Sequence, residues 1–241
     1  MTIQSCFERY EKQYCLSIRQ QRFLMERMRP YMQKDEYGEY TICNIYYYTD
    51  ARRLIRSSMD KPVYKEKLRV RSYGVPEEGD RVFVELKKKF DGIVYKRRIT
   101  MPVCEVDGFL SGRSGDDFGQ IGREIRYFQS FYRTAPKVFI GYDRTAFAGT
   151  DDPELRVTFN TKLRWRTSKL DLAYGDQGML LLPGGEVLME VKMPGACPLW
   201  LSRLLSEAGA FPTSFSKYGA CYSGSILRAG PTILKEDTCC A

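Results

Sequence analysis

The chain has 241 residues, with 38 Lys and Arg against 30 Asp and Glu and no histidine, which gives a net charge of +8. The length suits one domain, since β-barrels often reach about 250 residues as a single unit. The basic balance favours an anionic partner. The absence of histidine excludes triads, general bases and metal sites that need an imidazole, so any chemistry must use carboxylates, Lys, Arg, Tyr, Cys or a metal held by oxygen ligands.

The cysteine spacing and the length of the apolar runs indicate in which cellular compartment the protein is expected. None of the eight cysteines forms a CxxC pair, and the clustered ligand spacing of a zinc site is absent. The N-terminal sequence lacks the apolar run of a signal peptide, and no apolar run approaches the roughly 20 residues that span a bilayer. We therefore expect reduced thiols, a cytoplasmic location and no membrane segment in this chain.

Periodicity predicts a mainly antiparallel β protein with several helices. Residues 6–15 are expected to form a strand, and 16–32 an amphipathic helix that ends or bends at Pro30. A strand at 41–48 precedes a short helix near 51–59. Further strands are predicted at 64–73, 81–90, 93–101, 136–146, 154–160, 162–167 and 186–193. Helices fit 119–133, 198–209 and 213–221. Residues 1–227 form one predicted domain, and 228–241 a disordered tail.

Basic and apolar residues alternate along the predicted strands. Side chains of a strand point alternately to its two faces, so one face of residues 67–71 (KLRVR) is wholly basic and the other apolar. The same alternation groups Glu85 with Lys87, Lys96 with Arg98, Arg156 with Thr158, Arg164 with Arg166, and Glu190 with Lys192. A solvated charged face is the ordinary alternative for a single strand. Six such strands favour a closed sheet, with helices over the apolar faces and the charges inside.

An enclosed group of Arg and Lys needs a counter-ion. Burying isolated charges costs of order tens of kcal/mol in the idealised limit, and a polyphosphate-like anion removes that cost because guanidinium groups bind phosphate oxygens in pairs. Glu85 and Glu190 are expected to project into the same space. A carboxylate that faces a triphosphate needs a cation between them, which suggests Mn²⁺ or Mg²⁺. An internal Glu–Lys salt bridge is the alternative for both residues.

At this point nine motifs resemble a known family. FERYEKQY, NIYYYTD, YKEKLRVRSYG, VFVELKKK, YKRRI, YDRTAF, LRVTF, LMEVK and SFSKYG occur in the order of the vacuolar transporter chaperone domains, which are triphosphate tunnel metalloenzymes. The resemblance implies an α+β fold, an eight-stranded antiparallel β-barrel with helices packed outside. It also implies transfer of the ATP γ-phosphate to a growing polyphosphate chain, with Mn²⁺ or Mg²⁺ and with phosphate or pyrophosphate as primer.

The resemblance assigns roles residue by residue. Tyr142 matches an aromatic that stacks on the base, with core packing as the alternative, and Glu190 matches a metal ligand, to which Glu85 is added as a candidate. The predicted catalytic residues are Arg69, Arg71, Lys87, Arg144 and Arg156. The predicted phosphate- or nucleotide-binding residues are Arg9, Lys96, Arg98, Tyr142, Lys192 and Lys217.

Two positions depart from the family pattern, and they leave other functions open. Gln13 stands where the family usually has lysine, and Tyr48 where relatives often have aspartate. The loss of the lysine removes one positive charge, so a non-catalytic polyphosphate or inositol phosphate sensor is one alternative. A metal-dependent hydrolase of tripolyphosphate or another triphosphate is the other. Nucleic acid is not an expected partner, because the basic residues fall on inward strand positions without an open groove of stacking aromatics.

Overall fold

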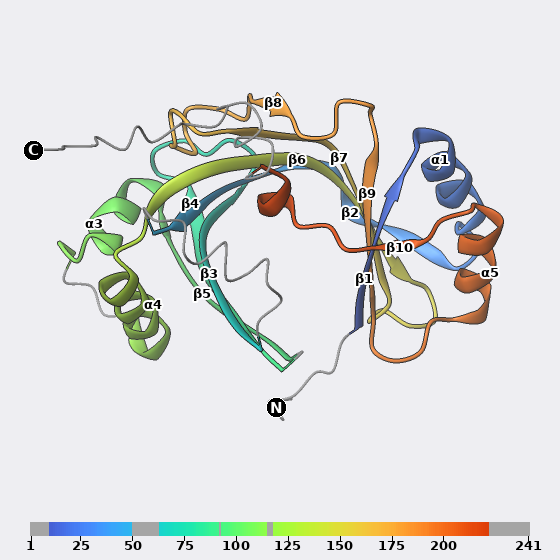
Figure 1. The fold of residues 1–241 in the computed structure, drawn as a ribbon, viewed down its shortest axis with the longest axis horizontal. Helices are drawn as coiled ribbons and strands as arrows, with labels where there is room; N and C mark the ends of the chain where they lie inside the picture. The colour runs from blue at the N-terminus through green and yellow to red at the C-terminus, as the bar shows by residue number, and fades with distance from the viewer. Residues whose placement is uncertain (1–9, 50–62, 92, 115–117, 222–241) are drawn as a thin grey trace, which may run out of the picture.

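One antiparallel sheet forms the centre of the structure (Figure 1). The computed structural model describes residues 10–49, 63–91, 93–114 and 118–221. The eight long strands are β1 (Tyr10–Leu16), β2 (Met32–Tyr48), β3 (Tyr64–Tyr73), β4 (Arg81–Phe90), β5 (Ile93–Pro102), β6 (Ala135–Gly149), β7 (Arg156–Arg166) and β9 (Val187–Met193). The strands β8 (Met179–Leu180) and β10 (Pro212–Thr213) have two residues each. The α+β class and the eight long strands are therefore confirmed.

The predicted closure of the barrel is wrong. The strands follow the order β10-β1-β9-β7-β6-β2-β3-β4-β5, with β8 beside β7, and in the described part of the chain β5 and β10 end the sheet without pairing to each other. The sheet still curves strongly between these two ends (Figure 1).

Helices cover the outer face of the sheet at its two ends. The helices α1 (Ile18–Arg27) and α5 (Leu199–Glu207) pack with β1, β7 and β9 around residues such as Leu24, Phe159 and Leu201. The helices α3 (Val106–Leu110) and α4 (Gly119–Tyr132) pack on β2, β3 and β4 around Phe109 and Ile125. A single 3₁₀ turn, η1 (Val103–Glu105), precedes α3. The expectation that helices cover the apolar faces is confirmed.

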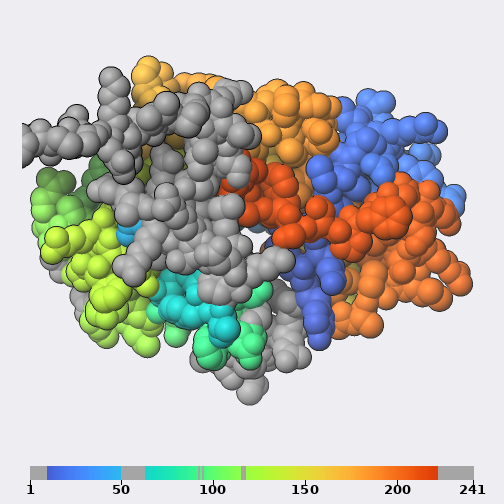
Figure 2. All heavy atoms as spheres, in the orientation of Figure 1, coloured from blue at the N-terminus to red at the C-terminus, as the bar shows by residue number. Residues whose placement is uncertain are grey.

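The opposite side of the sheet, which we call the inner face, carries Arg69, Arg71 and Arg144. One end of this face is filled by a third apolar cluster that includes Tyr46, Tyr48 and Tyr218. Tyr218 comes from the segment 212–221, which follows α5, pairs with β1 through β10 and ends in a helical turn at 217–221. Figure 2 shows this segment in red-orange, next to β1 in blue.

The predicted alternation is wrong for the second half of β7, because a bulge interrupts this strand. The register of β6 and β7 shifts between Gly141 and Asp143, and Lys162 has a φ of 47°, in the left-handed region. One extra residue moves the following side chains to the other face. Arg164 and Arg166 therefore lie on the outer face, where Arg164 Nη2 is 3.0 Å from Asp143 Oδ1 and Arg166 lies over the ring of Phe139.

Other boundaries also differ from the prediction. The first helix ends at Arg27, and β2 begins already at Met32, nine residues before the predicted strand. This early part of β2 contains a register shift between Lys34 and Glu39, and Gly38 has a positive φ of 68°. The predicted strands 154–160 and 162–167 are one strand, β7. The predicted helix at 51–59, residues 6–9 of the first strand and the predicted tail lie outside the described residues.

The packing of α4 on the sheet gives a stability test. Ile125 is fully buried and Phe131, six residues further along the same helix, is 64% exposed. We expect Ile125→Ala to lower the free energy of unfolding by about 2–5 kcal/mol, because it leaves a cavity in the outer core. Phe131→Ala removes a larger side chain, but this side chain is mostly exposed and loses only its contacts with neighbouring aromatic rings. This substitution should cost about 1 kcal/mol. Urea denaturation measures both values, and equal costs would contradict the packing described.

Candidate functional site

The alternation of the strands brings the predicted cations together on the inner face. On β3, Leu68 and Val70 are buried in the outer core, so Arg69 and Arg71 project to the other side. The same alternation places the following predicted residues on the inner face: Glu85, Lys87, Lys96, Arg98, Tyr142, Arg144, Arg156, Glu190 and Lys192. Lys217 reaches this group from the segment 212–221. Arg9 lies outside the described residues.

Glu85 is the centre of one ionic cluster. Its side chain is 1% exposed, and Arg69 donates from Nε to Glu85 Oε2 at 2.7 Å. Lys96 Nζ lies 2.6 Å from the other carboxylate oxygen. Burial alone would raise the pKa of Glu85, but Arg69, Arg71 and Lys96 outweigh it and lower the pKa to about 2. Glu85 is therefore an ionised partner of two cations.

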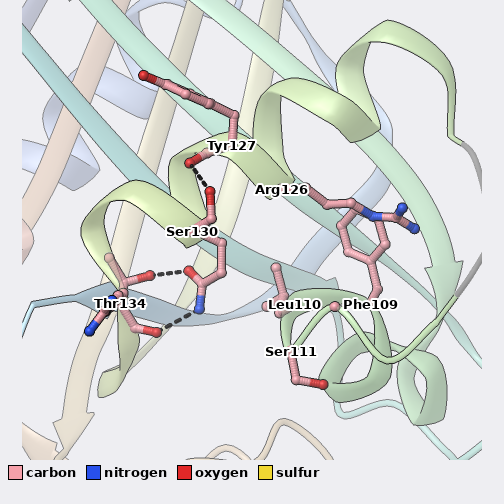
Figure 3. Close-up of a pocket in the computed structure, with 10 residues that line it drawn as sticks. Phe109, Leu110, Ser111, Arg126, Tyr127, Ser130 and Thr134 are labelled. Atoms are coloured by element: carbon pink, nitrogen blue, oxygen red, sulfur yellow. Dashed lines mark hydrogen bonds between the residues drawn. The ribbon is translucent and has the colours of Figure 1, made fainter.

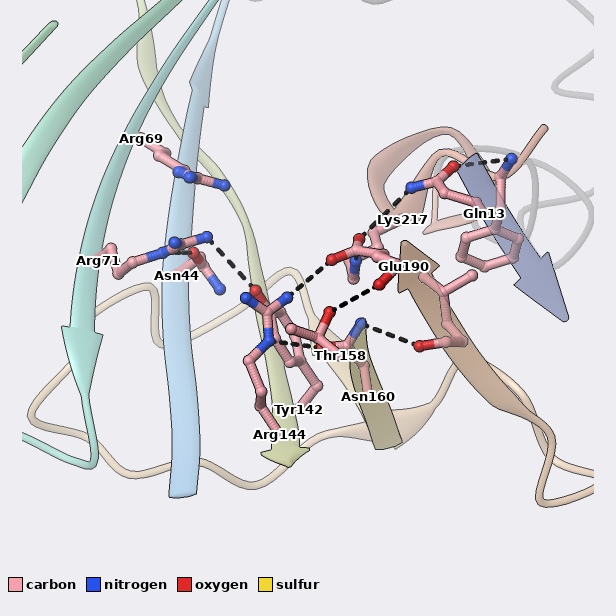
Figure 4. A network of polar contacts seen from close by, with 12 residues as sticks. Gln13, Asn44, Arg69, Arg71, Tyr142, Arg144, Thr158, Asn160, Glu190 and Lys217 are labelled. Atoms are coloured by element: carbon pink, nitrogen blue, oxygen red, sulfur yellow. Dashed lines mark hydrogen bonds and ion pairs between the residues drawn. The ribbon is translucent and has the colours of Figure 1, made fainter. Parts of the chain in front are cut away.

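Glu190 is the centre of a second cluster, across the inner face from Arg69 (Figure 4). Arg144 Nη2 lies 2.9 Å from Glu190 Oε2, and Lys217 Nζ lies 2.5 Å from Oε1. Gln13 donates to the same Oε1 at 3.4 Å and accepts from the backbone N–H of Phe215. Burial opposes ionisation, yet Lys217 and Arg144 hold the pKa of Glu190 far below its ordinary value. The salt-bridge alternative thus describes both carboxylates in this structure.

Two buried asparagines orient the inner arginines. Arg71 donates from Nε to Asn44 Oδ1 at 2.8 Å, and Asn44 donates to the carbonyl of Ile140. Arg144 donates from Nε to Asn160 Oδ1 at 2.8 Å, and Asn160 donates to the carbonyl of Leu188 (Figure 4). Each guanidinium is thereby fixed, through its asparagine, to the backbone of the next strand but one in the sheet. Sequence reasoning missed both asparagines, although a strand-disfavoured residue inside the apolar runs TICNIYYY and LRVTFN was an available signal.

Tyr142 lies between the two clusters and is only 2% exposed. Arg71 donates to its hydroxyl at 3.3 Å, while Arg144 and Lys217 lie 5.3 Å and 5.1 Å from the centre of its ring. Burial raises the pKa of the phenol, but the three cations lower it to about 7. The ring therefore has no free face for a base in this structure, and the core-packing alternative fits its surroundings.

Cations outnumber carboxylates on the rest of the inner face. Burial and the neighbouring Lys65, Lys87 and Arg69 lower the pKa of Lys67 to about 8. Burial is also the largest cause that lowers the pKa of Lys192, which feels the charge of Lys87 from across the inner face. The pKa values of these ammonium groups are lowered by burial and by neighbouring cations. A bound polyanion would favour their charged forms, so this surface suits a polyanion.

The donors for a metal are few. In the described ranges no three His, Cys, Asp or Glu side chains form a group that could hold a metal ion. Mg²⁺ is commonly held by one or two carboxylates together with phosphate oxygens and water. Glu190 and Glu85 are the predicted carboxylates for such a site. In this structure cations approach both oxygens of each: Arg144 and Lys217 those of Glu190, and Arg69 and Lys96 those of Glu85.

A separate pocket of about 560 Å³ lies on the outer side of the molecule, between α3 and α4 (Figure 3). It is lined by residues that include Phe109, Ser111, Arg126 and Tyr127. None of the predicted site residues lines it, so it is distinct from the inner face. None of the helices in the described part of the chain is long and apolar enough to cross a membrane.

The curved sheet with its basic inner face defines a protein of the triphosphate tunnel class. The VTC domain family model matches residues 8–225, so the chain belongs to the VTC domain family. No curated protein matches the chain.

Solved structures support the fold. A candidate adenylate cyclase from Bacillus halodurans aligns with a TM-score of 0.54 at 12% identity, over 86% of this chain and 92% of that one. A candidate adenylyl cyclase from Hippeastrum, described as having a dominant triphosphatase activity, aligns with a TM-score of 0.50 at 15% identity, over 89% and 95%. At these identities the likeness concerns the fold alone.

The low pKa of Glu85 predicts how stability depends on pH. Because the pKa of about 2 in the folded chain lies below the ordinary 4.5, the ionised carboxylate stabilises the folded state above pH 4.5, and this contribution disappears as the pH falls towards 2. Between pH 5 and pH 2 the wild type should lose about 3 kcal/mol more than Glu85→Gln. Chemical denaturation across this range measures the difference. The exposed Glu78→Gln serves as the control, and a Glu85→Gln curve parallel to that of wild type would contradict the assignment.

Proposed function

We propose that this chain is a metal-assisted phosphotransferase that moves the terminal phosphoryl group of ATP onto inorganic polyphosphate. In this reaction the bond between the β,γ-bridging oxygen and the γ-phosphorus breaks, a terminal phosphate oxygen of the polymer forms the new bond, and ADP leaves. The observation that supports this proposal is the set of inner-face cations that buried partners hold in place. Arg69 is held by Glu85, and Arg144 is held by Glu190 and Asn160. This arrangement favours a substrate made of linked phosphates.

The state of the buried carboxylates favours transfer over hydrolysis. Hydrolysis needs a base that takes a proton from water, and a base is weak when its pKa is far below neutral. Glu85 and Glu190 are both held ionised by cations, with pKa values of about 2 for Glu85 and lower than ordinary for Glu190. A terminal phosphate of the polymer is already ionised near neutral pH and needs no strong base.

The length of the basic surface favours a polymeric acceptor. Lys65, Lys67, Arg69 and Arg71 follow one another on the same face of β3, a run of about 20 Å at the usual rise per residue. Lys87 and Lys89 on β4 stand opposite Lys67 and Lys65. Such a track offers contacts along an extended chain of phosphates, beyond those that a single triphosphate needs.

The residues of the chain contribute mainly by position and charge, as is usual for phosphoryl transfer. Arg71 and Arg144 are already oriented by Asn44 and Asn160, so little freedom is lost when they bind phosphate oxygens. Arg69 and Lys96 share the charge of Glu85 and can bind phosphate with their remaining donors. A divalent ion, when bound at Glu190, would neutralise charge on the phosphates and polarise them.

One assay separates the proposed transferase from its alternatives. Purified protein is incubated with ATP and Mn²⁺, and the products are resolved by gel electrophoresis and chromatography. Formation of long polyphosphate with an equivalent amount of ADP is the expected result. Free phosphate without polymer would replace the proposal by a hydrolase, the activity described for the Hippeastrum neighbour. Tight binding of polyphosphate without any turnover would indicate a sensor, for which Gln13 would be the sequence feature.

Two adjacent lysines provide a matched control for the same assay. Lys87 lies on the inner face, while Lys88 lies on the outer face, 3.4 Å from Glu124 and 3.8 Å from Glu66. A lost charged hydrogen bond costs about 1.5–3 kcal/mol, so Lys87→Ala should lower the rate of polymer formation about tenfold or more. Lys88→Ala should stay within about twofold of wild type. Equal effects of the two substitutions would remove the inner face from the reaction.

A further inference from the structure

A row of aromatic side chains crosses the inner face diagonally, from β2 to β4. The ring centres of Tyr37 and Tyr40 are 6.2 Å apart, those of Tyr40 and Tyr73 are 5.9 Å apart, and those of Tyr73 and Phe83 are 5.8 Å apart. Arg98 on β5 continues the row, with its guanidinium carbon 4.8 Å from the centre of the Phe83 ring. We call Tyr37, Tyr40, Tyr73 and Phe83 the aromatic row.

The register of the sheet places Tyr40, Tyr73 and Phe83 on the inner face. Ile42 pairs with Tyr73 and Arg71 pairs with Phe83, so these three aromatic residues are successive diagonal neighbours on one face. Tyr37 joins the row through its ring contact with Tyr40. Tyr73 follows Arg71 by two residues on β3 and therefore shares its face. Tyr40 pairs directly with Arg144 on β6. The row thus starts beside the two arginines that Asn44 and Asn160 hold in place.

Among the described residues of the inner face, the row offers exposed ring surface that Tyr142 does not. Tyr37 is 71% exposed and Tyr73 is 55% exposed, whereas Tyr142 is 2% exposed and has cations over its ring. Large aromatic side chains exposed side by side are unfavourable in water unless a bound partner covers them. A partner with a flat, apolar group at one end and several phosphates at the other fits this surface, where the aromatic row lies beside the arginines.

We propose that the aromatic row binds the heterocyclic base of a nucleoside triphosphate whose phosphates lie on Arg71 and Arg144. This inference rests on the proposed function, because it assumes phosphates on the inner face. It assigns the base to Tyr73 and its neighbours instead of Tyr142. Stacking uses the π-face that every base has, so the row selects nucleotides over inorganic tripolyphosphate more strongly than it selects one base over another.

Calorimetric titration with two ligands tests the proposal. The ligands are a non-hydrolysable ATP analogue and inorganic tripolyphosphate, each at the same concentration of Mn²⁺. Loss of one stacked base costs about 1–3 kcal/mol, so Tyr73→Ala should weaken the nucleotide analogue by about 5- to 150-fold. Tripolyphosphate should change by less than about twofold. Tyr73→Trp, which restores a stacking surface, should keep the affinity for the nucleotide.

The control is Tyr127→Ala on the outer surface of α4, where the tyrosine is 69% exposed and stacks on Phe131. It should leave both affinities unchanged. Equal weakening of both ligands by Tyr73→Ala would overturn the assignment, as would selective loss of the nucleotide in Tyr142→Leu but not in Tyr73→Ala. If wild-type protein binds neither ligand, the proposed function itself fails. If it binds tripolyphosphate normally and Tyr73→Ala leaves the nucleotide affinity unchanged, only the aromatic row is excluded.

Discussion

Repulsion among the cations of the inner face is the constraint on which the rest of the structure depends. Strand alternation places Arg and Lys from both halves of the curved sheet on one side, and the apolar side chains between them pack under the helices. Glu85 and Glu190 each pair with two of these cations but carry only one negative charge each. The remaining positive charge is incompletely balanced: burial lowers the pKa of Lys67, and the neighbouring Lys65, Lys87 and Arg69 lower it further. A polyanion would supply the missing charge.

The sequence was sufficient for most of the fold because periodicity depends on local chemistry. The strands at 64–73, 81–90 and 187–193 and the helix at 119–132 follow directly from the spacing of their apolar residues. Two features could not be predicted in this way. The early part of β2 is charged and shows no alternation, and the bulge at Lys162 is a backbone irregularity that moves Arg164 and Arg166 outward. Closure of the sheet depends on contacts between distant strands, which no local pattern encodes.

Sequence reasoning predicted which face of the strands carries the charged residues, but not the hydrogen bonds that hold these residues in place. Alternation alone identified the face of Arg69, Arg71 and Glu190. The asparagines that orient the arginines were missed, because their partners are carbonyl groups on other strands. The surroundings of Gln13 are also visible only in the structure: Lys217, 204 positions along the chain from Gln13, approaches Glu190 at 2.5 Å beside the glutamine amide.

The most direct measurement is a crystal structure of the protein with tripolyphosphate and Mn²⁺. We expect the phosphates to lie on the inner face, with oxygens within hydrogen-bond distance of Arg71 and Arg144 and with those guanidinium groups still held by Asn44 and Asn160. Phosphates found only on the outer surface, or an inner face on which these arginines turn away from the bound anion, would contradict the central role given to the inner face.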